Sequence, residues 1–374
     1  MSIGRAILNA VIEYPDDNLP RLIYADWLEE TDDPANADYA RFIRAQVALA
    51  ARRADPGATP RDLAELEEAA RTAEQAYSVA WVGERVARLY PWSWDRGFVD
   101  RMIISQSAYL RYGPHLHRNT PLQRVSFAGR VPVDLGRFAG RSWFRHLRDV
   151  TVRFWCRASG FERFAASPHV RLRHLRVEGG GPDPADIRRV TESGWGPGLE
   201  TLQIREIPNP MPGTLGEALG APGLRGLRDL LVGSTRLAPA DLAALGAGND
   251  RRPLERLALH GVGLTPDRLR ALTDTPLFRR GVARLSLYRN ALTDAAVAGL
   301  AEAPGVERVV SLDLKHNDFG DAGARALAGS PRVAGLRQLL AWGNRLSPRG
   351  QHALRSRFGG RVYVRPRAGW SMDG

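Results

Sequence analysis

Apolar residues recur along the chain in one spaced pattern, L-x-x-L-x-L-x-x-N-x-L. The clearest copies begin at Val282, Val309 and Leu336, at intervals of 27 residues. The same frame fits earlier copies at intervals of 25 to 28 residues, which begin at Leu254, Leu227, Leu199, Leu172, Leu147 and Leu122. A degenerate further copy is expected near Phe98. Repetition at a nearly constant period predicts an array of stacked structural repeats.

Each copy predicts one strand followed by one helix. The L-x-L alternation is typical of a short strand with one buried face. The Ala- and Leu-rich segments DAAVAGLAEAP and DAGARALAGSP predict helices, with Asp294 and Asp321 as their N-caps. One strand and one helix cannot bury their apolar faces alone, so neighbouring copies must stack to form a continuous core.

An asparagine stands where each of the clearest copies turns out of its strand. These residues are Asn290, Asn317 and Asn344. Their amides can bond backbone groups that the turn leaves unpaired, which predicts a structural asparagine ladder. Earlier copies carry Val262, Thr235 and Ile207 instead, so the N-terminal repeats are expected to be less regular.

The pattern resembles the leucine-rich repeats of the ribonuclease-inhibitor-like class over residues 98–364, most specifically over 254–348. This resemblance implies an α/β fold: a curved solenoid with parallel strands on the concave face and helices on the convex face. The predicted solenoid, with its C-terminal cap, spans residues 98–374. Residues 205–224 depart from the pattern, because the prolines there, three of them at 208, 210 and 212, prevent a long regular helix.

The segment PDDNLPRLIYADWLEETDD, followed by ARFIRAQ, resembles the bacterial repeat-companion domain, a module found ahead of leucine-rich repeats. The matching residues are Asp16, Asp17, Pro20, Arg21, Leu22, Tyr24, Ala25, Asp26, Trp27, Leu28, Glu29, Phe42, Ile43 and Gln46. The family offers no settled activity to transfer. We therefore predict a small helical domain over residues 1–55.

Amphipathic spacing supports helices in this N-terminal part. The apolar stripes are Leu19, Leu22, Ile23 and Trp27, and then Phe42, Ile43 and Val47. Residues 56–97 are predicted to form the N-terminal cap of the solenoid. This segment includes a long helix over residues 61–89. Because a solenoid needs its open end covered, Trp81, Trp92 and Trp94 are assigned to that cover.

Charge is unevenly distributed along this arginine-rich chain. The formal net charge is +12, yet residues 1–100 hold 11 basic and 18 acidic residues, and Lys315 is the only lysine. A basic body can attract nucleic acid, acidic protein or an anionic membrane. Codon bias in a GC-rich genome, which replaces lysine by arginine without a function, is the competing interpretation.

Location follows from the cysteine count and the apolar runs. The single cysteine, Cys156, excludes an intramolecular disulfide and is expected to be a buried apolar side chain. No apolar run approaches the ~18 residues that a membrane span requires, and the N-terminus lacks a signal-peptide pattern. We expect a cytoplasmic protein without a membrane partner.

No signature of catalysis stands out. The sequence contains no P-loop, zincin or nucleophile-elbow motif, so neither enzymatic activity, nor a cofactor, nor a metal is expected. His115 and His117 are interpreted as surface histidines. The paired acids Asp16, Asp17, Asp32 and Asp33 are interpreted as helix caps and solvated loops, with an acidic enzyme site as a secondary alternative.

The outward strand positions of the last four copies are the most informative. The seventh position holds His260, Tyr288, Lys315 and Trp342, with Arg289 and His316 beside them. Aromatic and cationic side chains carry most of the binding energy in protein interfaces, so these are the candidate partner-binding residues. Trp342 could instead shield the C-terminal end of the solenoid.

The outward positions also distinguish protein from nucleic acid. Over nine copies the basic residues are Arg124, Arg153, Arg176, Arg205, Arg256, Arg284 and Lys315, and the acidic ones are Asp149, Glu178, Asp229 and Asp313. A groove that tracks phosphates should exclude acids. The mixture favours a non-enzymatic scaffold for a protein partner of unknown identity. Binding of nucleic acid or another polyanion is the alternative.

Overall fold

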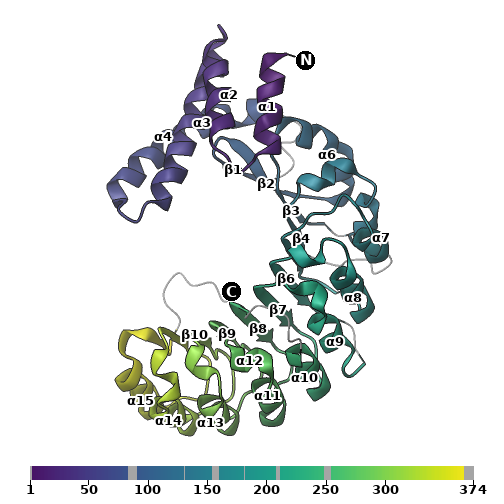
Figure 1. Ribbon diagram of the computed structural model, residues 1–374. Helices are drawn as coiled ribbons and strands as arrows, with labels where there is room; N and C mark the ends of the chain where they lie inside the picture. Colours follow the sequence, from purple (N-terminus) through teal and green to yellow (C-terminus); the bar gives the residue numbers. More distant parts are fainter. Residues whose placement is uncertain are drawn as a thin grey trace. The chain divides into compact units, whose positions relative to one another are not determined.

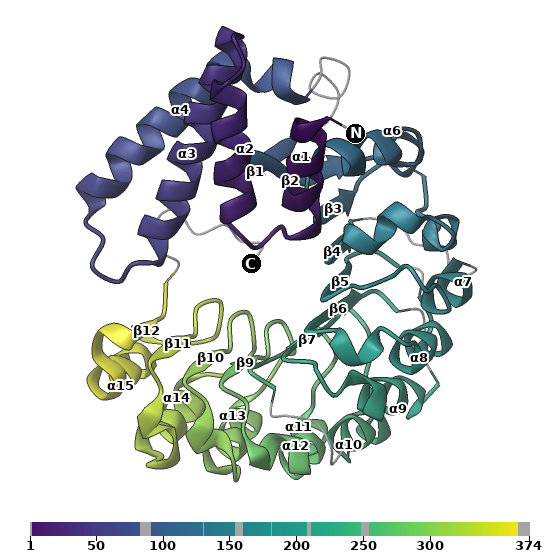
Figure 2. The same ribbon diagram turned by 45° about the horizontal axis from the view of Figure 1, so that its top comes forward.

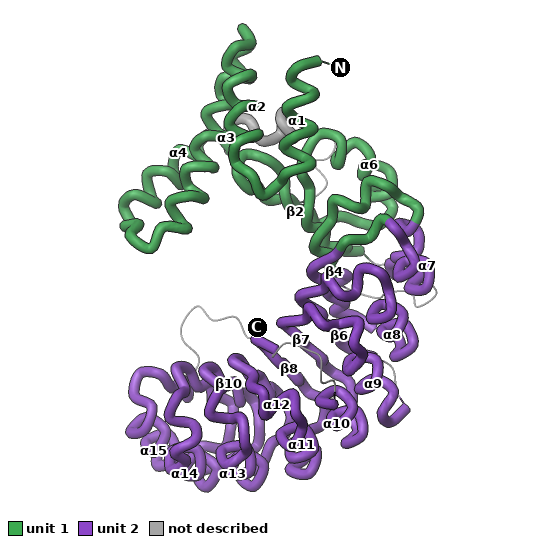
Figure 3. The backbone as a smooth tube through the Cα atoms, in the orientation of Figure 1, with its two compact units in different colours: residues 1–131, 140–151, 169–171 green, residues 132–139, 152–168, 172–374 purple. Residues whose placement is uncertain are grey.

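The structure is a computed structural model. It describes residues 2–82, 91–129, 131–153, 160–180, 182–207, 211–247 and 254–365, apart from the side chains of residues 73 and 75–82. The chain divides into two compact units (Figure 3). Unit 1 comprises residues 1–131, 140–151 and 169–171, and unit 2 comprises residues 132–139, 152–168 and 172–374.

Strands and helices alternate along most of the chain (Figure 1). The strands are β1 (Trp92–Asp95), β2 (Phe98–Ile104), β3 (Arg124–Phe127), β4 (Asp149–Val152), β5 (His174–Val177), β6 (Thr201–Arg205), β7 (Asp229–Gly233), β8 (Arg256–His260), β9 (Arg284–Ser286), β10 (Ser311–Asp313), β11 (Gln338–Leu340) and β12 (Val362–Tyr363). The α-helices are α1 (Ile3–Glu13), α2 (Leu19–Glu29), α3 (Pro34–Ala54), α4 (Pro60–Val82), α6 (Gln106–Asn119), α7 (Phe161–Ala165), α8 (Pro184–Glu192), α9 (Thr214–Gly220), α10 (Pro239–Ala247), α11 (Pro266–Thr273), α12 (Pro276–Arg280), α13 (Asp294–Glu302), α14 (Asp321–Gly329) and α15 (Pro348–Phe358). The 3₁₀ turns are η1 (Leu135–Phe138), η2 (Ser142–His146), η4 (Gly196–Gly198), η5 (Pro222–Leu224), η6 (Val306–Arg308), η7 (Arg332–Gly335) and η8 (Gly359–Arg361).

The strands of unit 2 confirm the leucine-rich repeat solenoid. Each of the strands β5 to β11 has the next one along the chain as a parallel neighbour. Equivalent positions of consecutive repeats pair, as Leu285, Leu312 and Leu339 do in β9, β10 and β11. The strands line the inner side of an arc and the helices line its outer side (Figures 1 and 2). In unit 1, β2 is parallel to β3, but β1 is antiparallel to β2.

The core of unit 2 lies between its strands and helices. The three paired leucines are at most 1% exposed. Leu300 of α13 and Leu327 of α14 close the same layer from the helix side and are as deeply buried. Because each repeat contributes the same positions, stacking removes them from water on both sides, as the repeat spacing predicts.

The predicted capping role of Asp294 and Asp321 is wrong. Each is the first residue of its helix, α13 or α14, and its carboxylate bonds the following repeat instead. Asp294 Oδ1 accepts hydrogen bonds from the N–H groups of Gly320 and Gly323, both at 2.7 Å. Asp321 Oδ1 accepts from the Ser347 N–H at 3.0 Å, and Oδ2 accepts from the Ser347 hydroxyl at 2.5 Å. The acids therefore link neighbouring helices, which holds the repeats in register.

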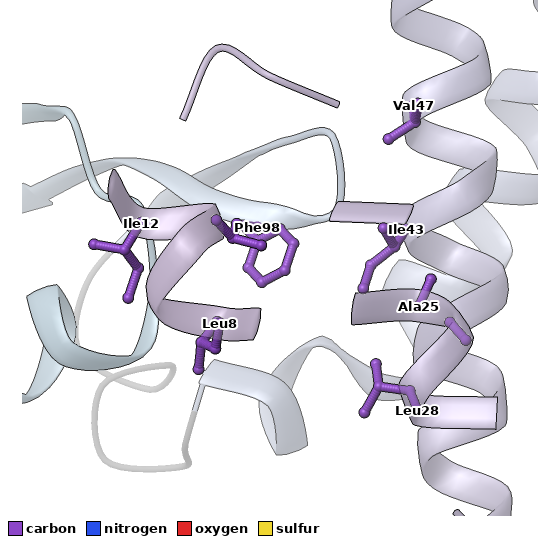
Figure 4. Packing of buried hydrophobic residues seen from close by; sticks show 9 residues of the cluster. Leu8, Ile12, Ala25, Leu28, Ile43, Val47 and Phe98 are labelled. Atoms are coloured by element: carbon purple, nitrogen blue, oxygen red, sulfur yellow. The ribbon is translucent and has the colours of Figure 1, made fainter. Parts of the chain in front are cut away.

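The helical core of unit 1 is formed by α1, α2, α3 and the start of β2 (Figure 4). Its buried residues are Leu8, Val11, Ile12, Ala25, Leu28, Ala40, Ile43, Val47 and Phe98. The predicted stripe of α2 is only partly correct, because Leu19 and Ile23 are 62% and 44% exposed. Leu22 and Trp27 pack against the core while remaining partly exposed.

The buried side of α2 carries an arginine, where the sequence pattern predicted Leu19 and Ile23. Arg21 is 1% exposed, and its guanidinium donates to the carbonyl oxygens of Pro15 (2.7 Å), Asp95 (3.2 Å) and Arg96 (3.2 Å). The β1–β2 turn thereby docks on the helices. Gly97 in that turn has φ +86°, and a Cβ there would collide with Ile43, so the position requires glycine.

The remaining sequence predictions concern helix α4, two single side chains and the domain boundaries. The helix predicted over 61–89 is described only as Pro60–Val82. Cys156 and the side chain of Trp81 lie outside the described residues. The helical core shares its compact unit with the first repeats, so domain boundaries at residues 55 and 97 stay predictions.

Candidate functional site

Outward side chains of β8 to β11 form three rows across the inner face of unit 2. Strand register aligns the first row, which is Arg256, Arg284, Ser311 and Gln338. The second row is Ala258, Ser286, Asp313 and Leu340. Beyond the strand ends, backbone bonds continue the register through the third row, which is His260, Tyr288, Lys315 and Trp342. The structure thus places these four predicted residues on consecutive repeats.

Lys315 is the centre of the third row. Its ammonium lies 5.4 Å from the ring centroid of Tyr288 and 4.9 Å from that of Trp342. Both are cation–π distances. Trp342 is only 9% exposed, which disfavours the first of its two predicted roles, partner binding, because that role requires an exposed indole. The ammonium covers it, so Trp342 supports Lys315 and offers a partner little surface.

Tyr288 is half-buried and is held from several sides. Its ring packs edge-on against His260 at 5.5 Å and against His316 at 5.4 Å. The guanidinium carbon of Arg289 lies 5.9 Å from the same ring. Arg289 is exposed, and both it and His316 have positive φ, at 56° and 52°. All six predicted partner-binding residues therefore belong to one contiguous cluster.

A polar chain connects the second and third rows. Ser286 Oγ donates to Asp313 Oδ2 at 3.0 Å, so it must accept from His260 Nε2 at 2.8 Å. The network therefore assigns the proton of His260 to Nε2. Burial, together with the charges of Arg205, Arg256 and Lys315, lowers the pKa of His260 to about 3. The imidazole is consequently neutral at physiological pH.

A pocket of about 260 Å³ opens among these rows. Its lining is Arg256, His260, Arg284, Leu285, Ser286, Ser311, Asp313, Lys315, Gln338 and Leu340. Sequence reasoning counted Arg256 and Arg284 as outward residues but did not assign them to the site. The signal that could have found them is their position, since they stand side by side on β8 and β9 in the first row.

The asparagine ladder lies at the turns beside this face. Asn290 and Asn317 are 3% and 7% exposed. Asn317 Oδ1 accepts from the N–H groups of Asn290 (2.9 Å) and Leu292 (3.1 Å), and its amide donates to the Leu287 carbonyl (2.9 Å). Asn344 is half-buried and also donates to carbonyls, but its buried Oδ1 has no hydrogen-bond partner among the described residues.

Thr235 performs part of the same role two repeats before the first asparagine of the ladder. Its hydroxyl accepts from the N–H of Ile207 at 2.9 Å and donates to the Gly233 carbonyl at 3.2 Å. A threonine side chain offers one oxygen and no amide, so it satisfies fewer backbone groups than asparagine does. The ladder thus weakens toward the N-terminal repeats.

The interpretation of His117 as a surface residue is wrong. His117 is 4% exposed, with Nε2 2.6 Å from the Tyr109 hydroxyl and its ring stacked on Trp143. Burial, and to a lesser degree His146, lowers the pKa of His117 to about 3. His115, by contrast, is exposed. Proximity of two histidines in sequence therefore does not bring them to one face.

The N-terminal acids make structural contacts. Asp33 accepts from the N–H of Ala35 at the start of α3, and Asp17 accepts from that of Leu19. Asp16 pairs with Arg148 at 2.6 Å. Within the described ranges, no group of three or more His, Cys, Asp or Glu side chains could hold a metal, and no helix is long and apolar enough to cross a membrane.

Two solved structures resemble the chain distantly. No family model and no curated protein sequence matches the chain. A Bacteroides fragilis protein of solved structure is 14% identical, with a TM-score of 0.38, over 80% of this chain and 83% of that one. An internalin from Listeria monocytogenes is 13% identical, with a TM-score of 0.35, over 62% of this chain and 71% of that one. Similarity of this degree assigns the chain to no family.

Proposed function

We propose that the protein is a non-enzymatic scaffold that binds a protein partner on the inner face of its C-terminal repeats. The observation that carries this proposal is the Tyr288 cluster, defined as His260, Tyr288, Arg289, Lys315, His316 and Trp342. Contacts on several sides fix the Tyr288 ring beside the exposed Arg289 guanidinium. Pre-organised tyrosine and arginine side chains lose little conformational entropy on binding, so they serve well as anchors.

Acidic residues weigh against a polyanion as the natural partner. Asp229 stands in the same row as Arg256, and Asp313 lies 3.6 Å from Lys315 in the next row, so both acids would repel successive phosphates. Alternating charges instead favour a protein surface of complementary pattern. An enzyme site at the N-terminal acids gains no support, because Asp16, Asp17 and Asp33 are engaged in ion pairing or helix capping.

The finer family assignment belongs to the same proposal. A repeat period of 27 to 28 residues with a helix in each C-terminal repeat supports the ribonuclease-inhibitor-like class. The buried roles of Arg21, Phe42 and Ile43 support a repeat-companion module over residues 1–55. We place residues 56–97 as a cap, residues 98–374 as the solenoid, and the protein in the bacterial cytoplasm.

The proposal can be tested by partner capture followed by calorimetry. The tagged full chain retains a partner from a lysate of the source organism, and the purified partner is titrated against variants. Tyr288→Ala should weaken binding by about 2 kcal/mol, because it removes the central ring. Trp342→Ala is a poor test, since this nearly buried indole also supports Lys315.

Arg325→Ala on the outer helix α14 is the matched control, because Arg325 is exposed and lies on the opposite side of the repeat. Its affinity should equal that of the unaltered chain. A partner that binds the Tyr288→Ala and Arg289→Ala double variant normally would refute the proposed face. Retention of nucleic acid in place of protein would support the polyanion alternative.

A further inference from the structure

The pocket among β8 to β11 has a chemistry that the Tyr288 cluster alone does not define. Among the described residues that line it, the cations are Arg256, Arg284 and Lys315, and the one carboxylate is Asp313. Binding of a protein surface in general does not require so many cationic hydrogen-bond donors in one pocket. Which of these groups are already satisfied within the chain determines what the pocket can accept.

Asp313 is fully engaged. Its Oδ2 accepts from Ser286 Oγ and lies 3.6 Å from the Lys315 ammonium, while its Oδ1 accepts from the Lys315 N–H at 3.0 Å. The side chain is only 15% exposed. Asp313 is therefore part of the pocket floor, and it neutralises Lys315 rather than the two arginines.

The arginines are placed differently. The nearest carboxylate oxygens are 3.7 Å from Arg256, at Asp229, and 3.9 Å from Arg284, at Glu255. Both distances exceed hydrogen-bond length, so among the described residues neither guanidinium donates a side-chain hydrogen bond. The two side chains stand on paired positions of β8 and β9, with 37% and 61% of their surface exposed. Adjacent guanidinium groups in this state are suited to a planar oxyanion.

We propose that this pocket binds a carboxylate side chain from an acidic, extended segment of the protein partner. The inference rests on the proposed function and specifies the partner's chemistry. Arg256 and Arg284 donate to the carboxylate, and the half-buried Tyr288 ring in the third row packs against the neighbouring residue of the segment. The hydrogen-bonded chain from neutral His260 through Ser286 to Asp313 holds the floor in place without adding positive charge.

The pocket's size and surroundings favour a peptide over a nucleic acid. At about 260 Å³ it is slightly smaller than typical ligand pockets, which span roughly 300–1,000 Å³, and so suits one or two side chains. A phosphate chain crossing the rows would also meet Asp229 on the strand next to Arg256. A single glutamate or aspartate between the arginines brings one negative charge near Asp229, whereas a phosphate chain brings several charges past both Asp229 and Asp313.

Fluorescence anisotropy with the full chain tests the inference. The probe is a short fluorescein-labelled peptide of alternating Glu and Ser, and its matched control peptide carries Gln in place of Glu. We expect the Glu peptide to bind at least about tenfold more tightly than the Gln peptide, because only a carboxylate satisfies both arginines. An unlabelled oligothymidylate strand and inorganic phosphate serve as competitors.

Two double variants with the same loss of charge separate the pocket from the general basic surface. Arg256→Gln with Arg284→Gln should weaken Glu-peptide binding by about tenfold or more. Arg325→Gln with Arg349→Gln, at exposed helix positions of α14 and α15, should leave it within about twofold. Thermal unfolding of each variant confirms that the fold is retained.

Three results would overturn the inference: equal binding of the Glu and Gln peptides, equal losses in the two double variants, or competition by oligothymidylate stronger than that by excess unlabelled Glu peptide. If the peptide fails to bind while a protein partner still depends on Tyr288, the proposed function stands and the carboxylate assignment falls. If the peptide binds this pocket but the captured partner does not require Tyr288, the proposed function falls instead.

Discussion

Replacing Asn317 by alanine should destabilise unit 2 strongly. Asn317 Oδ1 is the acceptor for the N–H groups of Asn290 and Leu292, and its amide donates to the Leu287 and Leu314 carbonyls. A buried donor left unsatisfied costs about 1–3 kcal/mol. Partial relaxation at two such donors leaves an expected loss of about 3 kcal/mol in the free energy of unfolding.

Asn344→Ala is the internal control for this prediction. Asn344 donates to the equivalent carbonyls, but its Oδ1 accepts no hydrogen bond among the described residues, and the side chain is half-buried. Its loss should therefore be smaller, about 1 kcal/mol. The difference between the two variants isolates the contribution of the Oδ1 acceptor.

Urea unfolding followed by tryptophan fluorescence gives both free energies, and hydrogen exchange reports the local effect. In Asn317→Ala the amides of residues 290 and 292 should exchange faster, since they have lost their acceptor. Equal losses in the two variants, or a loss below about 0.5 kcal/mol for Asn317→Ala, would refute the reasoning.

Three further predictions concern burial. Because burial lowers the pKa of His117 to about 3, only the unfolded chain binds a proton at this residue between about pH 6.5 and 3. The free energy of unfolding should therefore decrease as the pH is lowered through this range. His117→Gln, unlike His115→Gln, should make this pH dependence weaker in urea titrations. Gly216→Ala should lower the melting temperature, because the new Cβ would lie 2.1 Å from a backbone oxygen. Gly299→Ala in α13 has no other atom within 4 Å of its Cβ and should raise the free energy of unfolding by about 0.5–1 kcal/mol. Equal effects of the two substitutions would contradict this reasoning. Arg21→Met should cost about 2–4 kcal/mol in chemical unfolding, because three carbonyls lose their donor; a neutral result would mean that the β1–β2 turn docks without it.

The repeat register was predictable from sequence because apolar spacing alone determines it. Once copies begin at Val282, Val309 and Leu336, every equivalent position must align across neighbouring strands. The alignment of Tyr288 with Lys315 follows from that register without any knowledge of packing. The same register places Arg256 and Arg284 side by side on neighbouring strands, so sequence alone could have paired them in the pocket.

Burial by distant segments was not predictable. Arg21 is buried because its guanidinium meets carbonyls 74 and 75 residues later in the chain, so hydrophobicity misidentified the inner face of α2. The ring of His117 stacks on Trp143, which lies in the separate 3₁₀ turn η2. Trp342 is nearly buried, and the ammonium of a lysine one repeat earlier lies over its ring. Each outcome depends on side-chain placement that a one-dimensional pattern does not contain.

Site-specific photo-crosslinking tests the central claim most directly. Benzoylphenylalanine replaces Tyr288 in one chain and the outer-face Arg325 in another, and each is irradiated in a lysate of the source organism. A protein adduct should form from position 288 and not from position 325, because the partner is proposed to lie on the inner face. Adducts from position 325 alone, or nucleic acid as the only adduct at position 288, would contradict the account.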